Sequence, residues 1–415
     1  MERELLVYAD LAAEIVIVGR LFARTRASKE SASFEYDDSW LRRRGAFAID
    51  PALSLTRGPF HTQRPLFNAF TDPAPDRWGQ TLMRRHERAR AKKEGRQPRT
   101  LLSVDFLTLV DDETRVGALR FKDVDGDAFL ASTGRRVPPV IELPRLLSAT
   151  ARIVDDRETD EDLLLVLAPG TSLGGSRPKA TVRDRDGRLL VAKFPRKDDE
   201  WPVTRWEAAT LALAESAGVV VPPWRLQSVL AKPVVMLRRF DRDGARRIPF
   251  MSALTALDAA DEEAPSYLGI AEAIRRDGSA VRADLHQLWR RIVFNVLVSN
   301  TDDHLRNHAL LRDAKGWRLA PAYDLNPMPV DVRPRVHAIA IDEHDETASL
   351  ESALAVAARF GIAKIADARA IAAEVGTAVA AWREVAKKHG IKRAEVDRMA
   401  SAFEHEDLRL ARGGR

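Results

Sequence analysis

The sequence predicts an α+β fold in which a β-rich first half is followed by a helical second half. Short apolar or alternating runs, such as 5–8, 14–18 and 33–37, lie near the start of the chain and are typical of strands. From about residue 250 onward, apolar residues recur at helical spacing, most clearly over 285–297. The 415 residues are enough for two or three domains.

The amino-acid composition excludes several kinds of functional site. The chain contains no cysteine, which excludes disulfides, thiolate metal sites and cysteine nucleophiles and suits a reducing compartment. The first residues carry acids where a signal peptide needs an apolar run, and no stretch of about 18 uncharged apolar residues follows. We therefore expect a soluble, cytoplasmic protein. The net charge of +5, from 66 basic and 61 acidic residues, is too balanced to predict nucleic-acid binding by itself.

Residues 1–150 are predicted to form a first, β-rich domain. One strand is expected to end at Gly19 in a hairpin-like turn, and a helix is expected over 76–91 with Asp76 as its N-cap. That helix runs into a basic segment, 84–96. The segment could bind nucleic acid, but the sequence favours a solvated helix end because no aromatic residue interleaves with the arginines.

The second predicted domain, 151–241, contains a stretch of small residues that we expect to lie among strands, Thr-Ser-Leu-Gly-Gly-Ser-Arg-Pro-Lys at 171–179. Gly174 and Gly175 lack a Cβ atom, so backbone N–H groups could approach a phosphate closely, and Lys179 could add a charge. The Gly-Lys-Ser/Thr ending of a Walker loop is missing. Taken alone, the stretch is better explained as a tight turn.

The segments after this stretch predict a hairpin, 180–183 with 189–194, and then a helix over 204–218. Lys193 stands in the second strand, where protein kinases place the lysine that binds the α- and β-phosphates. Glu207 on the helix could pair with it, as a helix glutamate does in kinases. The alternatives are a solvent-facing lysine and a glutamate that only favours the helix.

The third predicted domain, 242–415, holds the most informative spacing. Asp302 and Asn307 are separated by four residues, like the catalytic Asp and the metal-binding Asn of the kinase catalytic loop. A hairpin over 309–320 follows, and then Asp324. Asp302, Asn307 and Asp324 are the residue types that a phosphoryl-transfer site needs, namely a base for a hydroxyl group and two oxygen ligands for Mg²⁺. No His-Arg precedes Asp302, and Tyr-Asp-Leu replaces Asp-Phe-Gly at 323–325.

A hydrolytic metal site is the main alternative for the same segment. Asp302, Asp303, His304 and His308 are all good metal ligands, and the two histidines lie four residues apart. This alternative leaves the glycine-rich stretch, Lys193 and the later aspartate unexplained. A purely structural cap of the preceding helix would need fewer than the five polar groups present.

Three motifs of this chain resemble those of the HipA-type serine/threonine kinases, which are toxins of bacterial toxin–antitoxin pairs. The motifs are Ser-Leu-Gly-Gly-Ser-Arg-Pro-Lys at 172–179, Asn-Thr-Asp-Asp-His-Leu-Arg-Asn-His at 300–308 and Pro-Ala-Tyr-Asp at 321–324. A looser likeness covers 34–40, 53–55 and 75–79. The resemblance implies a protein-kinase-like bilobal fold, with a β-rich N-lobe and a helical C-lobe, and an additional N-terminal β-rich subdomain.

The resemblance also implies a site for ATP and Mg²⁺. Asp302 would be the catalytic base, and Asn307 and Asp324 would bind Mg²⁺. Ser172 matches the family's autophosphorylated serine, whose modification would switch the kinase off. The segment from Met236 to Phe240 would be the hinge that lines the adenine, and an acidic residue is usual where Arg238 stands. The residues expected to bind the nucleotide are Gly174, Gly175, Ser176, Lys179, Lys193, Met236, Arg238, Phe240, His304, Asn307, Tyr323 and Asp324.

The family further implies the partners. The substrate would be a serine or threonine of a protein, with an aminoacyl-tRNA synthetase expected, and its phosphorylation would slow translation and growth. A helix-turn-helix, HipB-like antitoxin would bind the chain and provide its only link to DNA. The alternative from a different class is a kinase-fold co-repressor with little or no turnover that acts with its antitoxin.

Overall fold

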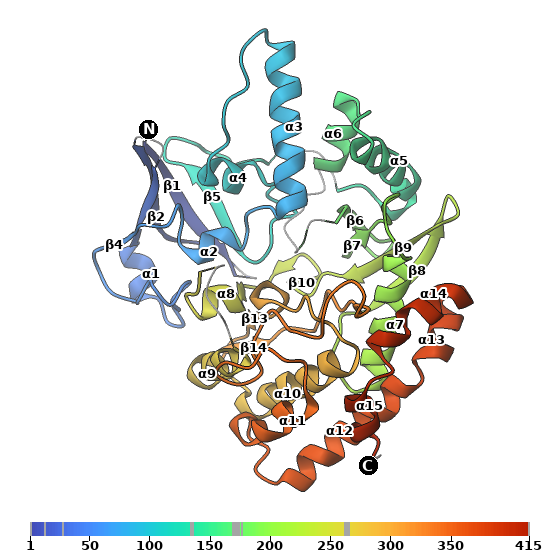
Figure 1. The fold of residues 1–415 in the computed structure, drawn as a ribbon. Coiled ribbons are helices and arrows are strands. Elements are labelled where there is room, and N and C mark those ends of the chain that lie inside the picture. The colour runs from blue at the N-terminus through green and yellow to red at the C-terminus, as the bar shows by residue number, and fades with distance from the viewer. Residues whose placement is uncertain are drawn as a thin grey trace. The chain divides into compact units, whose positions relative to one another are not determined.

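The chain forms two compact units in the computed structural model, which describes residues 2–11, 14–26, 29–132, 137–167, 175, 177–260 and 266–413 (Figure 1). Unit one comprises residues 1–197, 229–232 and 236–251, and unit two comprises residues 198–228, 233–235 and 252–415. The strand β9 (Lys232–Arg238) changes unit along its length. The division of the sequence into 1–150, 151–241 and 242–415 stays a prediction.

Unit one begins with a five-stranded antiparallel sheet of order β4-β3-β2-β1-β5. Its strands are β1 (Glu2–Asp10), β2 (Ile15–Arg26), β3 (Lys29–Tyr36), β4 (Pro59–Thr62) and β5 (Leu119–Asp123). In β1 the buried residues alternate, as Leu5, Val7 and Ala9, which is the period of a strand with one covered face.

The predicted turn at Gly19 is wrong, because β2 runs through this residue to Arg26. The glycine serves a close approach between strands instead. A Cβ atom at Gly19 would lie 2.2 Å from the backbone oxygen of Glu35 on the neighbouring strand. The register of β1 and β2 also shifts between Val7 and Tyr8, as at a β-bulge. A glycine within a strand pattern can therefore mark a bulge as well as a turn.

The helices of unit one include the one that the sequence predicts over 76–91. They are α1 (Asp38–Arg42), α2 (Asn68–Thr71), α3 (Arg77–Lys93), α4 (Ser103–Leu109), α5 (Leu143–Val154) and α6 (Asp160–Leu167), with a 3₁₀ turn η1 (Val140–Glu142) before α5. Asp76 caps α3 as predicted, since its Oδ1 accepts a hydrogen bond of 2.8 Å from the N–H of Gly79. Residues 160–167, which come before the glycine-rich stretch in sequence, form helix α6 rather than a strand.

The predicted hairpin is confirmed as β6 (Lys179–Arg183) and β7 (Leu189–Lys193). Lys179 and Lys193 are directly opposite each other in its register. Unit one ends with the short strands β10 (Arg242–Asp243) and β11 (Arg246–Arg247), and β12 (Phe250–Ser252) leads the chain into unit two.

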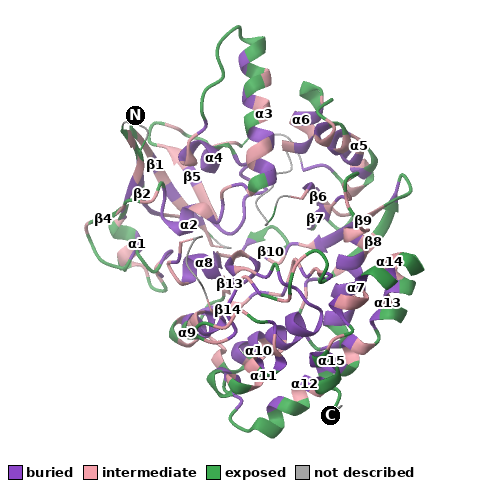
Figure 2. Cartoon of the chain, in the orientation of Figure 1, coloured by how far each residue is buried: buried purple, intermediate pink, exposed green. Residues whose placement is uncertain are grey.

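Unit two is mostly helical and is built around α10 (Val281–Leu297), whose residues Leu288, Trp289 and Ile292 are fully buried (Figure 2). Its other elements are α7 (Val203–Ser216), β8 (Trp224–Val229), α8 (Ala253–Ala256), α9 (Tyr267–Asp277), η2 (Leu305–Asn307), β13 (Ala309–Arg312), β14 (Trp317–Leu319), α11 (Leu350–Ala355), η3 (Ala357–Phe360), α12 (Ile365–Ala380), α13 (Trp382–Lys388), α14 (Arg393–Arg398), η4 (Met399–Ala402) and α15 (Glu406–Ala411). Strands β13 and β14 form the predicted antiparallel hairpin.

The end of unit two consists of more helical segments than the sequence predicts. We expect three helices separated at Gly361 and Gly390, and both glycines do end helical segments with positive φ angles of 80° and 71°. The boundary between α12 and α13 falls at Ala381, where no glycine or proline signals it. No helix among the described residues is long and apolar enough to cross a membrane.

Candidate active site

The predicted catalytic loop follows α10 directly in unit two. Helix α10 ends at Leu297, and Ser299 takes a left-handed conformation with φ 51°. The chain then turns so that adjacent aspartates have opposite surroundings. The side chain of Asp302 is 67% exposed, whereas that of Asp303 is 2% exposed. The two carboxylates therefore have different roles.

Asp303 holds the loop against the two helices that precede it. Its Oδ2 accepts hydrogen bonds from the Tyr267 hydroxyl on α9, from Asn295 Nδ2 on α10 at 3.0 Å and from His308 Nε2 at 2.7 Å. Burial by itself would raise the pKa of Asp303, but its bonds to His308 and Tyr267 outweigh burial and lower the pKa from the ordinary value. The buried carboxylate thus fixes the shape of the loop and is not open to a substrate.

Asp302 presents its carboxylate to solvent. Its Oδ1 pairs with Arg333 at 3.0 Å, in an ion pair with both side chains at least 40% exposed. Such exposed pairs contribute at most about 1 kcal/mol and are readily exchanged for another partner. On the backbone side, Asn307 Nδ2 donates to the Asp302 carbonyl oxygen at 3.3 Å. The backbone is held while the carboxylate remains accessible, which is what a base for an incoming hydroxyl group requires.

The loop that carries Asp324 runs beside the catalytic loop. The Tyr323 hydroxyl donates to the Arg306 carbonyl oxygen at 2.7 Å, and the backbone N–H of Asn326 donates to Asn300 Oδ1 at 3.4 Å. Asp324 itself has a positive φ of 60°, a strained conformation for a residue with a side chain. These two bonds place Asp324 next to the turn that contains Asn307.

The oxygens at this junction fit a divalent cation. Asn307 is 4% exposed, and its buried Oδ1 has no hydrogen-bond partner among the described residues. A buried amide oxygen without a partner is costly unless a ligand satisfies it. Asp324 supplies a carboxylate nearby, and Mg²⁺ prefers such oxygen ligands. His304 Nδ1, in the same loop as Asn307, is also buried without a partner in the described structure, which leaves a second polar atom for a ligand.

The alternative of a hydrolytic metal site is not formed. Within the part of the chain that the structure describes, no group of three or more His, Asp or Glu side chains is placed to hold a metal ion. His308 is bonded to Asp303 inside the protein, while Asp302 points outward. His308 and Asp303 are therefore engaged with each other and do not join the exposed Asp302 in a metal site.

The other predicted nucleotide residues lie in unit one. Gly175 has a positive φ of 86°, which only glycine adopts readily, and its carbonyl oxygen accepts a bond of 3.3 Å from Lys179 Nζ. Lys193, Arg238 and Phe240 are partly buried, and Met236 is buried. Gly174, Ser176 and Ser172 lie outside the described residues. Their joint site with Asp302, Asn307 and Asp324 stays a prediction.

A buried ionic cluster holds the end of the predicted hinge and the residues just after it. Asp241 accepts bonds from Arg239 at 2.6 Å and Arg242 at 2.7 Å, and from the backbone N–H of Gly117 at 2.9 Å. Burial by itself would raise the pKa of Asp241, but the two guanidinium groups lower it well below the ordinary value. The cluster ties residues 239–242 to the chain before β5 within unit one. Sequence alone did not single out any of these residues.

Comparison with known protein families shows which family the chain belongs to. The family description "HipA-like C-terminal domain" matches residues 171–382, which is just over half of the chain, and "HipA N-terminal domain" matches residues 11–105. The chain belongs to the HipA family. The three motifs that suggested this family from the sequence all lie within the C-terminal match.

A solved structure shows the same fold over nearly the whole HipA chain. The HipA protein in a complex of HipA, HipB and operator DNA from Shewanella oneidensis superposes with a TM-score of 0.68 at 15% identity, covering 98% of this chain and 96% of that one. The antiparallel sheets and the helical second unit agree with the predicted α+β, kinase-like fold class, which is confirmed.

Two curated relatives match part of the chain. The protein named "Putative kinase Y4mE" from Sinorhizobium fredii is 31% identical over 180 residues, 37% of this chain. A "Putative kinase" from Haemophilus influenzae is 26% identical over 189 residues, 39% of this chain. These matches span 41% and 54% of the length of the two relatives. Activity, substrate and partners of this HipA-family chain are therefore proposals.

The basic segment 84–96 is partly neutralised. Arg85 pairs with Glu158, Arg90 with Glu94 and Arg96 with Glu87. Three of the seven basic side chains of the segment are thus engaged by carboxylates. This pattern is typical of a solvated helix end.

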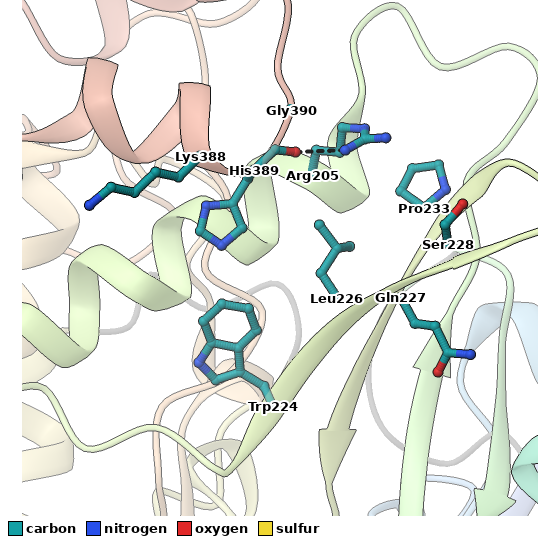
Figure 3. A pocket seen from close by; sticks show the side chains of 9 residues that line it. All are labelled: Arg205, Trp224, Leu226, Gln227, Ser228, Pro233, Lys388, His389 and Gly390. Carbon is teal, nitrogen blue, oxygen red and sulfur yellow. Dashed lines mark hydrogen bonds between the residues drawn. The ribbon is translucent and has the colours of Figure 1, made fainter.

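A groove of about 460 Å³ lies elsewhere in unit two, between α7, β8 and the end of α13 (Figure 3). The Trp224 and His389 rings lie 5.8 Å apart on one side of it, and Arg205 donates to the His389 carbonyl oxygen at 2.6 Å. None of the predicted nucleotide or catalytic residues lines this groove. It is separate from the candidate active site.

Proposed function

We propose that this HipA-family protein is an ATP-dependent serine/threonine protein kinase and the toxin of a toxin–antitoxin pair. One observation carries the proposal. Hydrogen bonds join the loop of Asp302 and Asn307 to the loop of Asp324, and the buried Asn307 Oδ1 has no partner in the described structure. A base, two oxygen ligands and an exposed approach are the parts that phosphoryl transfer requires.

The catalytic roles follow from the surroundings of each residue. Asp302 accepts the proton of the substrate hydroxyl group, because its carboxylate is exposed and releases Arg333 at little cost. Asn307 and Asp324 hold Mg²⁺, which when bound neutralises charge on the phosphates. Asp303 keeps this loop in place through its three buried bonds.

We propose that three parts of the chain bind the nucleotide. Gly174, Gly175 and Ser176 cover the phosphates, and Lys193 binds them from β7. The segment from Met236 to Phe240, including Arg238, lines the adenine. Additional nucleotide contacts come from Lys179, His304 and Tyr323.

The test of activity uses purified protein with Mg²⁺ and labelled ATP. The wild-type protein should transfer phosphate, and Asp302→Asn should abolish transfer while ATP still binds. Asp397→Asn on α14 is the matched control, because it also neutralises an exposed carboxylate that is paired with an arginine. If the wild-type protein neither binds ATP nor transfers phosphate, the proposal fails.

We also propose that autophosphorylation of Ser172 switches the kinase off. Phosphopeptide mapping should find phosphate on Ser172, and Ser172→Ala should leave an enzyme whose activity does not decline during incubation with ATP. Phosphate found only at other positions would remove Ser172 from the mechanism.

The partners follow from the family. The substrate is a protein serine or threonine, with an aminoacyl-tRNA synthetase as the first candidate, and a HipB-like helix-turn-helix antitoxin binds the chain. The Shewanella HipA, whose fold this chain shares, was solved with HipB and operator DNA. Co-purification with a small helix-turn-helix protein encoded by a neighbouring gene would test the antitoxin proposal. Tight association and ATP binding without transfer would favour a co-repressor instead.

A further inference from the structure

A buried ion pair joins the end of the glycine-rich stretch to helix α3. Lys179 Nζ lies 2.6 Å from Asp76 Oδ2, and the two side chains are 3% and 7% exposed. The same ammonium group donates to the Gly175 carbonyl oxygen at 3.3 Å. A lysine ammonium has three N–H groups, so these two contacts leave one for a further acceptor.

Asp76 divides its two carboxylate oxygens between two tasks. Oδ1 caps α3 by accepting from the N–H of Gly79 at 2.8 Å, while Oδ2 faces Lys179. The cap needs only an acceptor oxygen, which asparagine also supplies. The ion pair needs the negative charge. The two contributions can therefore be separated by one substitution.

The pair also lies beside the lysine that is expected to bind phosphates. Lys179 and Lys193 are directly opposite in the β6–β7 hairpin, so their side chains leave the same face of this sheet. Two ammonium groups at such a position repel each other unless one is neutralised. Asp76 supplies that neutralising charge for Lys179.

The ion pair joins the two regions that define the family. Asp76 lies in the match to the HipA N-terminal domain, and Lys179 lies in the match to the HipA-like C-terminal domain. Both residues belong to unit one. Removing one charge of a buried pair is strongly destabilising in general, so this contact constrains the position of the start of β6.

We propose that Asp76 is a positioning residue for ATP binding, which it supports by holding Lys179 and the start of β6 in place. This inference rests on the proposed kinase function. It gives the N-terminal domain a direct part in shaping the nucleotide site. The opposite arrangement, in which Asp76 withholds Lys179 from ATP, predicts an effect of opposite sign.

The experiment measures the ATP dependence of transfer by Asp76→Asn. This variant keeps the acceptor for Gly79 and loses only the charge, so α3 remains capped. The KM for ATP should rise by about tenfold or more while kcat stays within about twofold, because positioning affects nucleotide binding before the chemical step. Asp76→Glu should recover part of the affinity. The control Glu94→Gln neutralises an exposed pair on the same helix and should change neither constant.

Three results would overturn the proposal. They are an unchanged KM, a lower KM, and a loss of kcat alone in Asp76→Asn. Hydrogen exchange of the amides of β6, measured without ATP, separates this proposal from the kinase function. Exchange should become faster in Asp76→Asn than in Glu94→Gln even if the wild-type protein uses no ATP. Equal exchange in the two variants would refute the anchor independently of activity.

Discussion

Substitution of Asp303 by asparagine should destabilise unit two. The same substitution at the neighbouring, exposed Asp302 should not. Three donors converge on one oxygen of Asp303, those of Tyr267, Asn295 and His308. Hydrogen bonds to a buried charge contribute about 1.5–3 kcal/mol each, and they are not additive. The amide keeps an acceptor but loses the charge and places an NH₂ group among donors. We expect a loss of about 3–5 kcal/mol, the range for breaking a buried pair.

The adjacent carboxylate is the natural control. Asp302→Asn removes one exposed ion pair, with Arg333, and should change the free energy of unfolding by no more than about 1 kcal/mol. The two variants differ by one position along the chain and have the same change in composition. Asp302→Asn should lose phosphoryl transfer and keep stability, whereas Asp303→Asn should lose stability.

Guanidinium unfolding, followed by tryptophan fluorescence, measures both variants, since the fully buried Trp289 reports on α10. The contribution of Asp303 should also depend on pH. Its pKa is lowered in the folded protein, so its stabilisation is complete above the ordinary pKa of about 3.9 and is lost as the pH falls further. Equal stability of the two variants at pH 7, within about 1 kcal/mol, would refute the role given to Asp303.

Three further predictions concern other parts of the chain. Burial lowers the pKa of His337 to about 4, so the wild-type protein should lose stability, by up to about 1.4 kcal/mol per pH unit, as the pH falls from about 6.5 to 4. His337→Gln should reduce this dependence by the share that His337 contributes, and an unchanged pH profile would contradict the prediction. Asn307→Ala should weaken Mg²⁺-dependent ATP binding by about tenfold or more in calorimetry, with ATP binding in EDTA unchanged. The double variant Arg88→Glu with Lys92→Glu should leave DNA binding by the antitoxin complex within about twofold; a salt-dependent loss would instead assign the basic segment to DNA.

Local patterns in the sequence were sufficient for several elements of unit one and for the central helix of unit two. The N-cap at Asp76 and the β6–β7 hairpin are confirmed because each depends on neighbouring residues along the chain. The predicted turn at Gly19 was wrong because the role of this glycine does not depend on its neighbours along the chain. Whether a glycine serves a turn or a close contact depends on the strand beside it, and that strand is distant in sequence.

The candidate site shows the same division. Spacing within one loop was enough to select Asp302 and Asn307, and order along the chain added Asp324 and Lys193. Neither could show that Asp303 would be buried by donors from two helices, or that Arg333 would pair with the exposed aspartate.

What the sequence determined by itself is the set of chemical groups and their order, since both are properties of the chain. What only the tertiary structure decided is the environment of each group. Two adjacent aspartates with the same intrinsic acidity became a buried support and an exposed carboxylate, and Lys179 acquired Asp76, about a hundred residues away, as its counter-ion. Burial and the partner supplied by a distant segment set the charge, the accessibility and hence the role of a side chain.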